Sequence, residues 1–303
     1  MSGLGHVLRQ HAFCEFMGYT SRVELLILLD HGDHSINKEL IKFQNWKTFN
    51  NEESLLNYIG RNSTVLVDYY NCNVELFNTV ANSKSWKVVV CSDIDWNIPD
   101  CSILINHLPN VNIQHYSHAK IKSYFFGPEY AILRRAFYLR PIHRSSNRFL
   151  ICLGGSRVRI EIELILNALL KMGVCIDSID IVTSENLSDL GVKNCYWNLN
   201  DVEMRELIAT SFVCIVTPGN ISYEVFKVHR RAIIGSLNSK QLEVSRMFQK
   251  LGLSVNAGKW RYADFSSLSH WIDKSKDTVR AQHRFFGECK LSEVKELFEQ
   301  LNA

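Results

Sequence analysis

Short apolar runs alternate with segments of helical period along most of the chain. In the first half these runs are "VELLILLD" at 23–30, "STVLVDYY" at 63–70, "WKVVVCSDI" at 86–94 and "CSILINH" at 101–107. Runs of this length, rich in Val, Ile and Leu and bounded by turn residues, are typical of β-strands. Because a sheet with one wet face would alternate apolar and polar positions, strands that are apolar throughout predict a parallel sheet covered on both faces.

The same alternation of apolar runs and helical segments resumes after a basic, proline-containing stretch, "LRPIHRSSNR" at 139–148. The strand-like runs there are "FLICLGGS", "SIDIVTS", "SFVCIVTPG" and "RAIIGSL". The segments expected to form crossover helices are 157–172, 201–210, 221–229 and 240–251. The tail at 283–303 also has helical period, and we expect it to pack across a domain surface.

This pattern predicts an α/β protein of two Rossmann-like, doubly wound domains. We place them at residues 1–140 and 148–303, with the C-terminal helix in the second domain. Ligands of open parallel sheets bind beyond the carboxyl ends of the strands. We therefore expect the ligand in a cleft between the two domains, close to the residues that follow each apolar run.

Composition narrows the class of protein. The 303 residues are 46% hydrophobic and 21% charged, an ordinary globular balance, and the net charge of +3 is too small to predict a nucleic-acid surface. Basic residues cluster at Arg134, Arg135, Arg140, His143, Arg144 and Arg148, and we interpret them as a solvated linker. Neither a leader peptide nor a run of about 18 apolar residues is visible. We therefore expect a cytoplasmic monomer without membrane insertion.

The cysteines and one polar loop bear on metal binding. Nine cysteines are spread along the chain without a C-x-x-C pair, so we expect reduced thiols, mostly in the core: Cys14, Cys72, Cys91, Cys101, Cys152, Cys175, Cys195, Cys214 and Cys289. The segment "LLDHGDH" at 28–34 superficially suggests a metal, but its spacing matches no zinc motif and a polar turn explains it. We expect neither a metal nor another cofactor.

Candidate chemistry in the first half begins at "SGLGHVLRQ", residues 2–10. Gly5 permits close approach of a ligand, and His6 and Arg9 share a face if a helix begins near them. A histidine can act on a proton and an arginine on an anion. The alternative is a tight turn followed by a helix with a surface histidine.

Four more residues follow predicted strands in this half. Asp68 and Tyr70 close one apolar run, where a carboxylate and a phenol can face the cleft. Asn106 ends another run, and Tyr130 follows in "FFGPEYAILRR". For Asp68 the alternative is a strand-end residue that caps the next turn.

In the second half, two loops suit a phosphate group. The first contains Gly154, Gly155 and Ser156, and the second contains Thr217, Gly219, Asn220 and Ser222. Each lies between a predicted strand and a predicted helix, where backbone N–H groups at the helix N-terminus favour a phosphate or diphosphate. Neither loop matches G-x-G-x-x-G or a Walker sequence, so NAD binding and ATP hydrolysis are disfavoured.

Glu224 lies about one turn into the helix that follows the second loop. A carboxylate there can accept hydrogen bonds from ribose hydroxyls, each worth about 1.5–3 kcal/mol when charge-assisted. The alternative is a negative charge that stabilises the start of a helix by about 0.3–1 kcal/mol.

In order along the chain, several stretches resemble one family. They are "GLGHVLR", "LVDYYN", "ILINH", "GPEYAILRRAFY", "FLICLGGS", "SYEVFKVHRRAI" and "KQLEVSRMFQKLG". Together and in this order, these stretches resemble the UDP-sugar hydrolases of pseudaminic acid biosynthesis. That family releases UDP from UDP-2,4-diacetamido-2,4,6-trideoxy-β-L-altropyranose and is related to glycosyltransferase-B enzymes. The resemblance implies two Rossmann-like domains, a UDP-linked amino-deoxy sugar as substrate, and hydrolysis with inversion and without a metal, in a pathway that supplies flagellin or surface polysaccharide glycosylation.

By the same resemblance, His6 corresponds to the family's essential histidine, Tyr70 to an active-site tyrosine and Glu224 to the carboxylate of the nucleotide site. Gln241 lies in the last matching stretch and is a further substrate-binding candidate. In the mechanism so implied, His6 takes a proton from water that attacks the anomeric carbon, while Tyr70 positions the water or a sugar substituent. Backbone amides near Asn220 stabilise the departing diphosphate.

Departures from the family pattern leave alternatives open. The family has a strand before its G-x-G-H turn, whereas His6 here is near the start, so we expect either that the start codon is misassigned and about ten residues are missing, or that the first domain lacks a central strand. Arg157 and Tyr69 replace residues common in the family, which puts the identity of the sugar in doubt. One rival function is a glycosyltransferase of the same fold, and another is a nucleotide-sugar-binding protein without catalysis.

Overall fold

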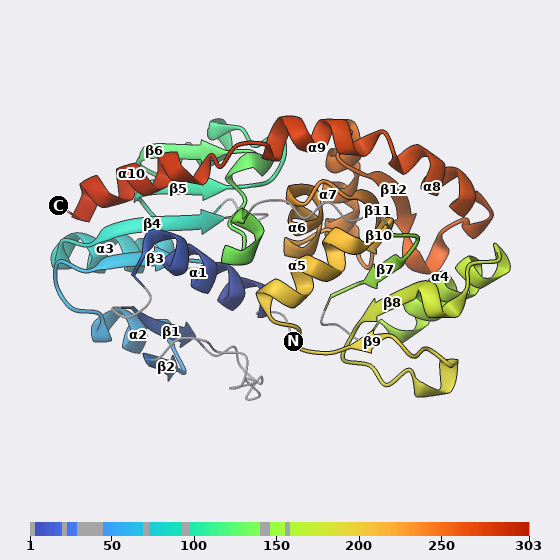
Figure 1. The fold of residues 1–303 in the computed structure, drawn as a ribbon. Coiled ribbons are helices and arrows are strands. Elements are labelled where there is room, and N and C mark those ends of the chain that lie inside the picture. The colour runs from blue at the N-terminus through green and yellow to red at the C-terminus, as the bar shows by residue number, and fades with distance from the viewer. Residues whose placement is uncertain are drawn as a thin grey trace. The chain divides into compact units, whose positions relative to one another are not determined.

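The computed structural model describes residues 4–19, 23–28, 45–68, 73–92, 97–139, 146–154 and 158–302, with the backbone alone for residues 4–6 and 8. Two compact units make up the chain. We call Arg135–Glu288 the C-terminal unit, and Gly3–Arg134 together with Cys289–Ala303 the N-terminal unit. Figure 1 shows their helices and strands.

The described strands of the N-terminal unit form two parallel sheets. One pairs β1 (Glu24–Leu28) with β2 (Asn45–Phe49). The other has the order β3-β4-β5-β6, with the bounds Thr64–Val67, Lys87–Ser92, Cys101–Asn106 and Ile121–Phe126. The α-helices are α1 (Leu4–Met17), α2 (Glu52–Tyr58), α3 (Val74–Lys84) and α10 (Leu291–Asn302). The short 3₁₀ turns are η3 (Ile113–Tyr116) and η4 (Pro128–Tyr130).

The division into two sheets separates the apolar core of this unit. One cluster gathers Leu25 and Cys14 of β1 and α1, and a second gathers side chains of β3, β4, β5 and α3, such as Val90 and Leu104. In the described residues, therefore, the N-terminal unit has a four-stranded parallel sheet and a separate two-stranded one, in agreement with the predicted α/β class.

The C-terminal unit has one parallel sheet of six strands in the order β12-β11-β10-β7-β8-β9. In chain order the strands are β7 (Phe149–Cys152), β8 (Ile179–Val182), β9 (Cys195–Tyr196), β10 (Val213–Val216), β11 (Arg231–Ser236) and β12 (Val255–Lys259). The α-helices are α4 (Arg159–Lys171), α5 (Asp201–Thr210), α6 (Asn220–Lys227), α7 (Ser239–Lys250), α8 (Leu268–Ser275) and α9 (Thr278–Phe286). The 3₁₀ turns are η5 (Arg135–Tyr138), η6 (Ile176–Ser178), η7 (Ser188–Leu190), η8 (Trp260–Tyr262) and η9 (Phe265–Ser267).

The strands of this sheet are buried on both faces. On one face Ile151 and Ile215 pack in a cluster with residues of α4 and α8. Their neighbours Cys152, Cys214 and Val216 are equally buried, although alternate side chains point to opposite faces of a strand. This is why the strands read as continuous apolar runs, as the sequence predicted.

The four predicted crossover helices begin and end within about two residues of α4, α5, α6 and α7, whereas the tail at 283–303 contains the end of α9 and, after a break, α10. Local capping explains where such helices begin. In α5, Asn200 accepts hydrogen bonds from the backbone N–H groups of Val202 and Glu203 at 3.0 Å, and the Glu203 carboxylate accepts one from the Asn200 N–H at 2.8 Å. Such a capping box fixes the first turn. The strands β2, β6, β9 and β12 are additions to the predicted set.

The structure corrects the assignment of the C-terminal helix. We placed it in the second domain, but α10 belongs to the N-terminal unit and packs against α1. Figure 1 shows it (red) beside strands of that unit. Phe298 contacts the edge of the Phe13 ring at 5.6 Å, and Thr64 donates a hydrogen bond to Asn302 at 2.6 Å. Helical period showed an apolar face on this helix but not the surface that covers it.

Arg148 corrects the interpretation of the basic stretch as a solvated linker. Its Nε and Nη2 donate to the two carboxylate oxygens of Asp180 at 2.6 and 2.5 Å, and the Asp180 side chain is 2% exposed. This hydrogen bonding raises the pKa of Arg148. Arg148 directly precedes β7, so the pair ties the start of β7 to β8, although 35% of the Arg148 side chain stays exposed. The 140–145 part of the stretch lies outside the described residues.

The cysteines agree in part with the expectation of core thiols. Among the cysteines in the described ranges, all are free thiols, and the buried ones are Cys14, Cys91, Cys101, Cys152 and Cys214. Burial disfavours the thiolate and raises the pKa of Cys214 to about 12. Cys175 and Cys195 are exposed, contrary to the expectation, and Cys72 lies outside the described residues.

Candidate functional site

The two glycine-containing loops of the C-terminal unit leave the sheet side by side. They follow β7 and β10, which are parallel neighbours with Cys152 opposite Val216. Thr217 Oγ1 donates a hydrogen bond to the Leu153 carbonyl at 3.2 Å, so the loops are joined where they begin. Gly154 has φ +90°, a conformation that other residues rarely adopt, and its Cα turns toward Thr217.

Helix α6 begins directly after the second loop. Gly219 is its N-cap and is exposed, with open space where a Cβ would lie. Backbone N–H groups of a first helical turn point out of the helix end, where they attract anions. Asn220 is the first helical residue and is half-buried. The loop, the exposed glycine and the helix start together form a surface suited to a phosphate group.

Ser222 has a different place from the one expected. Its side chain is fully buried, its hydroxyl donates to the Gly219 carbonyl at 2.7 Å, and it accepts from the Gly219 N–H at 3.3 Å. Ser222 therefore shapes the turn that presents Gly219. Gln241 similarly caps α7, because its Oε1 accepts a hydrogen bond from the Leu237 N–H at 2.8 Å. Direct substrate contacts of Ser222 and Gln241 stay predictions.

Glu224 lies four residues after Asn220 and is only 4% exposed. The neighbouring Tyr223 and Phe226 are buried among the rings of Phe248 and Phe286, which fixes α6 in the unit. A carboxylate shielded from bulk water forms stronger hydrogen bonds than an exposed one. Glu224 is thus a buried carboxylate one turn after the phosphate-suited surface, and its contact with a ribose stays a prediction.

In the N-terminal unit, Arg9 and Asp68 form a buried ion pair. Arg9 Nε donates to Asp68 Oδ2 at 2.7 Å, and Nη2 donates to Oδ1; the two side chains are 4% and 1% exposed. This bidentate geometry fastens α1 to the residue that follows β3. Gly5 and His6 lie in α1, and His6 is three residues before Arg9. A role of Asp68 beside a substrate stays a prediction.

Asn106 and Tyr130 also have partners within the N-terminal unit. Asn106 is fully buried; its Nδ2 donates to the Tyr116 hydroxyl at 2.7 Å and its Oδ1 accepts from the Leu108 N–H at 2.9 Å. Tyr130 donates its hydroxyl hydrogen to Glu293 of α10 at 2.9 Å. Burial and this hydrogen bond raise the pKa of Tyr130 to about 12, so its phenol stays protonated. Their substrate-binding roles stay predictions.

Three site candidates, Tyr70, Gly155 and Ser156, lie outside the described residues, as does nearly all of the loop at 28–34. Within the described ranges, no group of three or more His, Cys, Asp or Glu side chains could hold a metal ion. Within the same ranges, no helix combines the length and the apolar character that a bilayer crossing requires.

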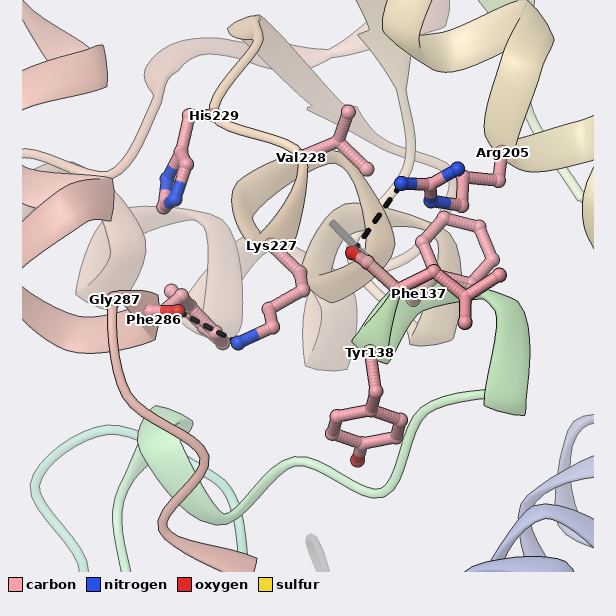
Figure 2. A pocket seen from close by; sticks show the side chains of 9 residues that line it. Phe137, Tyr138, Arg205, Lys227, Val228, His229, Phe286 and Gly287 are labelled. Atoms are coloured by element: carbon pink, nitrogen blue, oxygen red, sulfur yellow. Dashed lines mark hydrogen bonds between the residues drawn. The ribbon is translucent and has the colours of Figure 1, made fainter. Parts of the chain in front are cut away.

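Sequence reasoning missed a cavity of about 170 Å³ at the other end of α6 (Figure 2). Its lining includes Arg205, Lys227 and His229 and the aromatic rings of Phe137 and Tyr138. The signal in the sequence was weak: a basic "KVHRR" after Glu224, which is equally typical of a solvated helix end.

The architecture defines the class of protein: an α/β protein with parallel sheets in two units, of the glycosyltransferase-B type. The chain is similar in structure to Arabidopsis thaliana UGT89C1 complexed with UDP-L-rhamnose, with a TM-score of 0.62 and 11% identity, over 98% of this chain and 96% of that one. It is also similar to the spinosyn rhamnosyltransferase SpnG complexed with thymidine diphosphate, with a TM-score of 0.51 and 12% identity, over 79% and 73% of the two chains.

In sequence the chain is a distant homologue of a bifunctional enzyme of Helicobacter pylori, the pseudaminic acid cytidylyltransferase and UDP-2,4-diacetamido-2,4,6-trideoxy-β-L-altropyranose hydrolase. The two are 26% identical over 258 residues, which is 82% of this chain. The chain spans about half the length of this curated relative, 48%. No protein-family model matches the sequence.

Proposed function

We propose that the chain hydrolyses a UDP-linked amino-deoxy sugar to UDP and the free sugar in the biosynthesis of a pseudaminic-type acid. The observation that carries the proposal is the nucleotide-suited arrangement in the C-terminal unit: two joined loops, the exposed Gly219 at the start of α6, and the buried Glu224 one turn further. The hydrolase activity in the name of the distant homologue supports the choice of substrate.

In the proposed complex the diphosphate lies at the start of α6, near Gly154, Gly219 and Asn220. The Glu224 carboxylate accepts hydrogen bonds from the ribose hydroxyls. Backbone dipoles at a helix N-terminus are already oriented before reaction, so they stabilise the charge that develops on the leaving diphosphate at little reorganisation cost. This role requires no metal ion.

The chemical step is attack of water on the anomeric carbon. The oxygen of water forms a bond to that carbon, its proton passes to the His6 imidazole, and the bond from the anomeric carbon to the diphosphate oxygen breaks, so that UDP leaves with both bonding electrons. Such general-base catalysis contributes about 10²–10⁴-fold. Attack from the face opposite the leaving group inverts the configuration. The Arg9–Asp68 pair positions α1, which carries His6.

The test is incubation of the purified protein with UDP-2,4-diacetamido-2,4,6-trideoxy-β-L-altropyranose in H₂¹⁸O without an acceptor. We expect UDP release with ¹⁸O in the sugar, because the anomeric carbon–oxygen bond breaks; ¹⁸O in UDP would contradict the mechanism. Turnover only after an acceptor is added would establish a glycosyltransferase instead. UDP binding without turnover in either case would establish a non-catalytic binding protein.

Two variants with matched controls assign the residues. Glu224→Gln is expected to weaken UDP binding about 10- to 100-fold, the equivalent of about 1.5–3 kcal/mol for charge-assisted hydrogen bonds. Glu243→Gln, an exposed carboxylate on α7, should leave binding unchanged. His6→Ala should lower kcat by at least about 100-fold. His11→Ala, in the same helix, is its control, and equal activity of the two variants would refute the base assignment.

A further inference from the structure

Within the described residues, the chain passes from one unit to the other after Arg134 and after Glu288. We call residues 135–139 the first connector and residues 286–288 the second connector. Both line the cavity at the end of α6: Phe137, Tyr138 and Leu139 come from the first connector, and Phe286 and Gly287 from the second. Segments about 150 residues apart therefore meet at one helix end.

Two basic side chains bind the connectors there. Lys227, the last residue of α6, donates a hydrogen bond from Nζ to the Phe286 carbonyl at 2.7 Å, and the same Nζ is 5.8 Å from the centre of the Tyr138 ring. Arg205 of α5 donates from Nη2 to the Leu139 carbonyl at 3.2 Å. Figure 2 shows both hydrogen bonds, with Lys227 lying between Tyr138 and Phe286. Lys227 thus contacts both connectors.

Helix α6 is held in the core of its unit by aromatic contacts. Phe226 meets Phe248 edge-on at 5.0 Å and Phe286 at 5.9 Å, and Tyr223 meets Phe248 at 5.2 Å. Lys227 is seven residues after Asn220, which is about 10 Å along a helix. Close-packed interiors have low compressibility and transmit strain, so we expect a ligand that restrains the start of this helix to affect the Lys227 end as well.

We propose that Lys227 is a positioning residue that couples nucleotide binding to the two connectors. It ties both connectors to the helix that carries the proposed diphosphate and ribose contacts, so nucleotide binding restricts the motion of the connectors. The coupling rests on the proposed function. Residues that absorb such motions are commonly distant from the chemistry, and their substitution alters turnover.

The experiment measures UDP affinity by calorimetry and amide hydrogen exchange in the connectors, with and without UDP. In the wild-type protein we expect UDP to slow exchange several-fold in both connectors. Lys227→Met keeps the aliphatic stem and removes the ammonium group. It should bind UDP within about twofold of wild type, lose the UDP-dependent slowing, and lower kcat more than it changes KM. Lys227→Arg should restore the slowing.

Lys250→Met is the matched control, because Lys250 ends the helix α7 of the same unit, is exposed and does not line the cavity. It should behave as wild type. If Lys227→Met binds UDP and shows the same UDP-dependent slowing as wild type, the coupling is wrong and the proposed function stands. If the wild-type protein does not bind UDP, the proposed function fails and the coupling fails with it.

Discussion

The Arg9–Asp68 ion pair allows a quantitative test of how the N-terminal unit holds α1. Both side chains are almost fully buried, and two hydrogen bonds join them. Removal of one partner leaves a buried charge, which typically costs about 3–5 kcal/mol. Arg9→Met and Asp68→Leu should therefore each lower the free energy of unfolding of this unit by that amount, enough to unfold a marginally stable domain in part.

The double variant should lose less unfolding free energy than the sum of the losses in the two single variants. With both charges replaced by apolar side chains, no charge is left without its partner, and the loss should be smaller than for either single variant. We expect a coupling energy of at least about 2 kcal/mol. Urea unfolding of the four proteins, followed by circular dichroism and by tryptophan fluorescence, measures it. A coupling energy below about 0.5 kcal/mol would refute the inference that these two residues act as a pair.

Three further predictions concern a glycine with positive φ, the reactivity of two thiols and the titration of a tyrosine. Gly127→Ala should destabilise the protein by more than about 1 kcal/mol in thermal unfolding, because Gly127 has φ +121° and a Cβ there would lie 2.5 Å from a Glu129 carboxylate oxygen. Gly60→Ala should lower the stability less, because the nearest atom to a Cβ at residue 60 would be 3.8 Å away. Equal losses of stability in the two variants would contradict the reasoning. At pH 8 iodoacetamide should modify exposed Cys175 well before Cys214, whose pKa of about 12 leaves about one thiolate in 10⁴; mass spectrometry of partly labelled protein measures the order. The raised pKa of Tyr130 contributes stability that is fully present below the ordinary phenol pKa of about 10 and is lost as the pH rises to about 12. Tyr130→Phe should therefore flatten the plot of unfolding free energy against pH between these two values. An unchanged plot would argue against the pKa shift.

The proposed site illustrates how far strand-end reasoning reaches. Gly154, Thr217, Gly219 and Glu224 could be selected in advance because each follows an apolar run, and parallel neighbours bring the ends of such runs together. The same reasoning could not tell which polar residues shape the loops. The hydroxyl of Ser222, a candidate for substrate contact, caps the turn at Gly219 in the structure.

By itself the sequence determined the α/β alternation, the helices α4, α5, α6 and α7, and most strands of the C-terminal unit, because burial on both faces forces continuous apolar runs and caps are local. Only the tertiary structure decided which surfaces meet. It placed α10 on the N-terminal unit, divided that unit's described strands into two sheets, and paired Arg9 with Asp68, 59 residues apart. It also brought both connectors to Lys227. Periodicity tells which face of an element is apolar, but the partner of that face depends on contacts between residues far apart in the chain, which no local pattern contains.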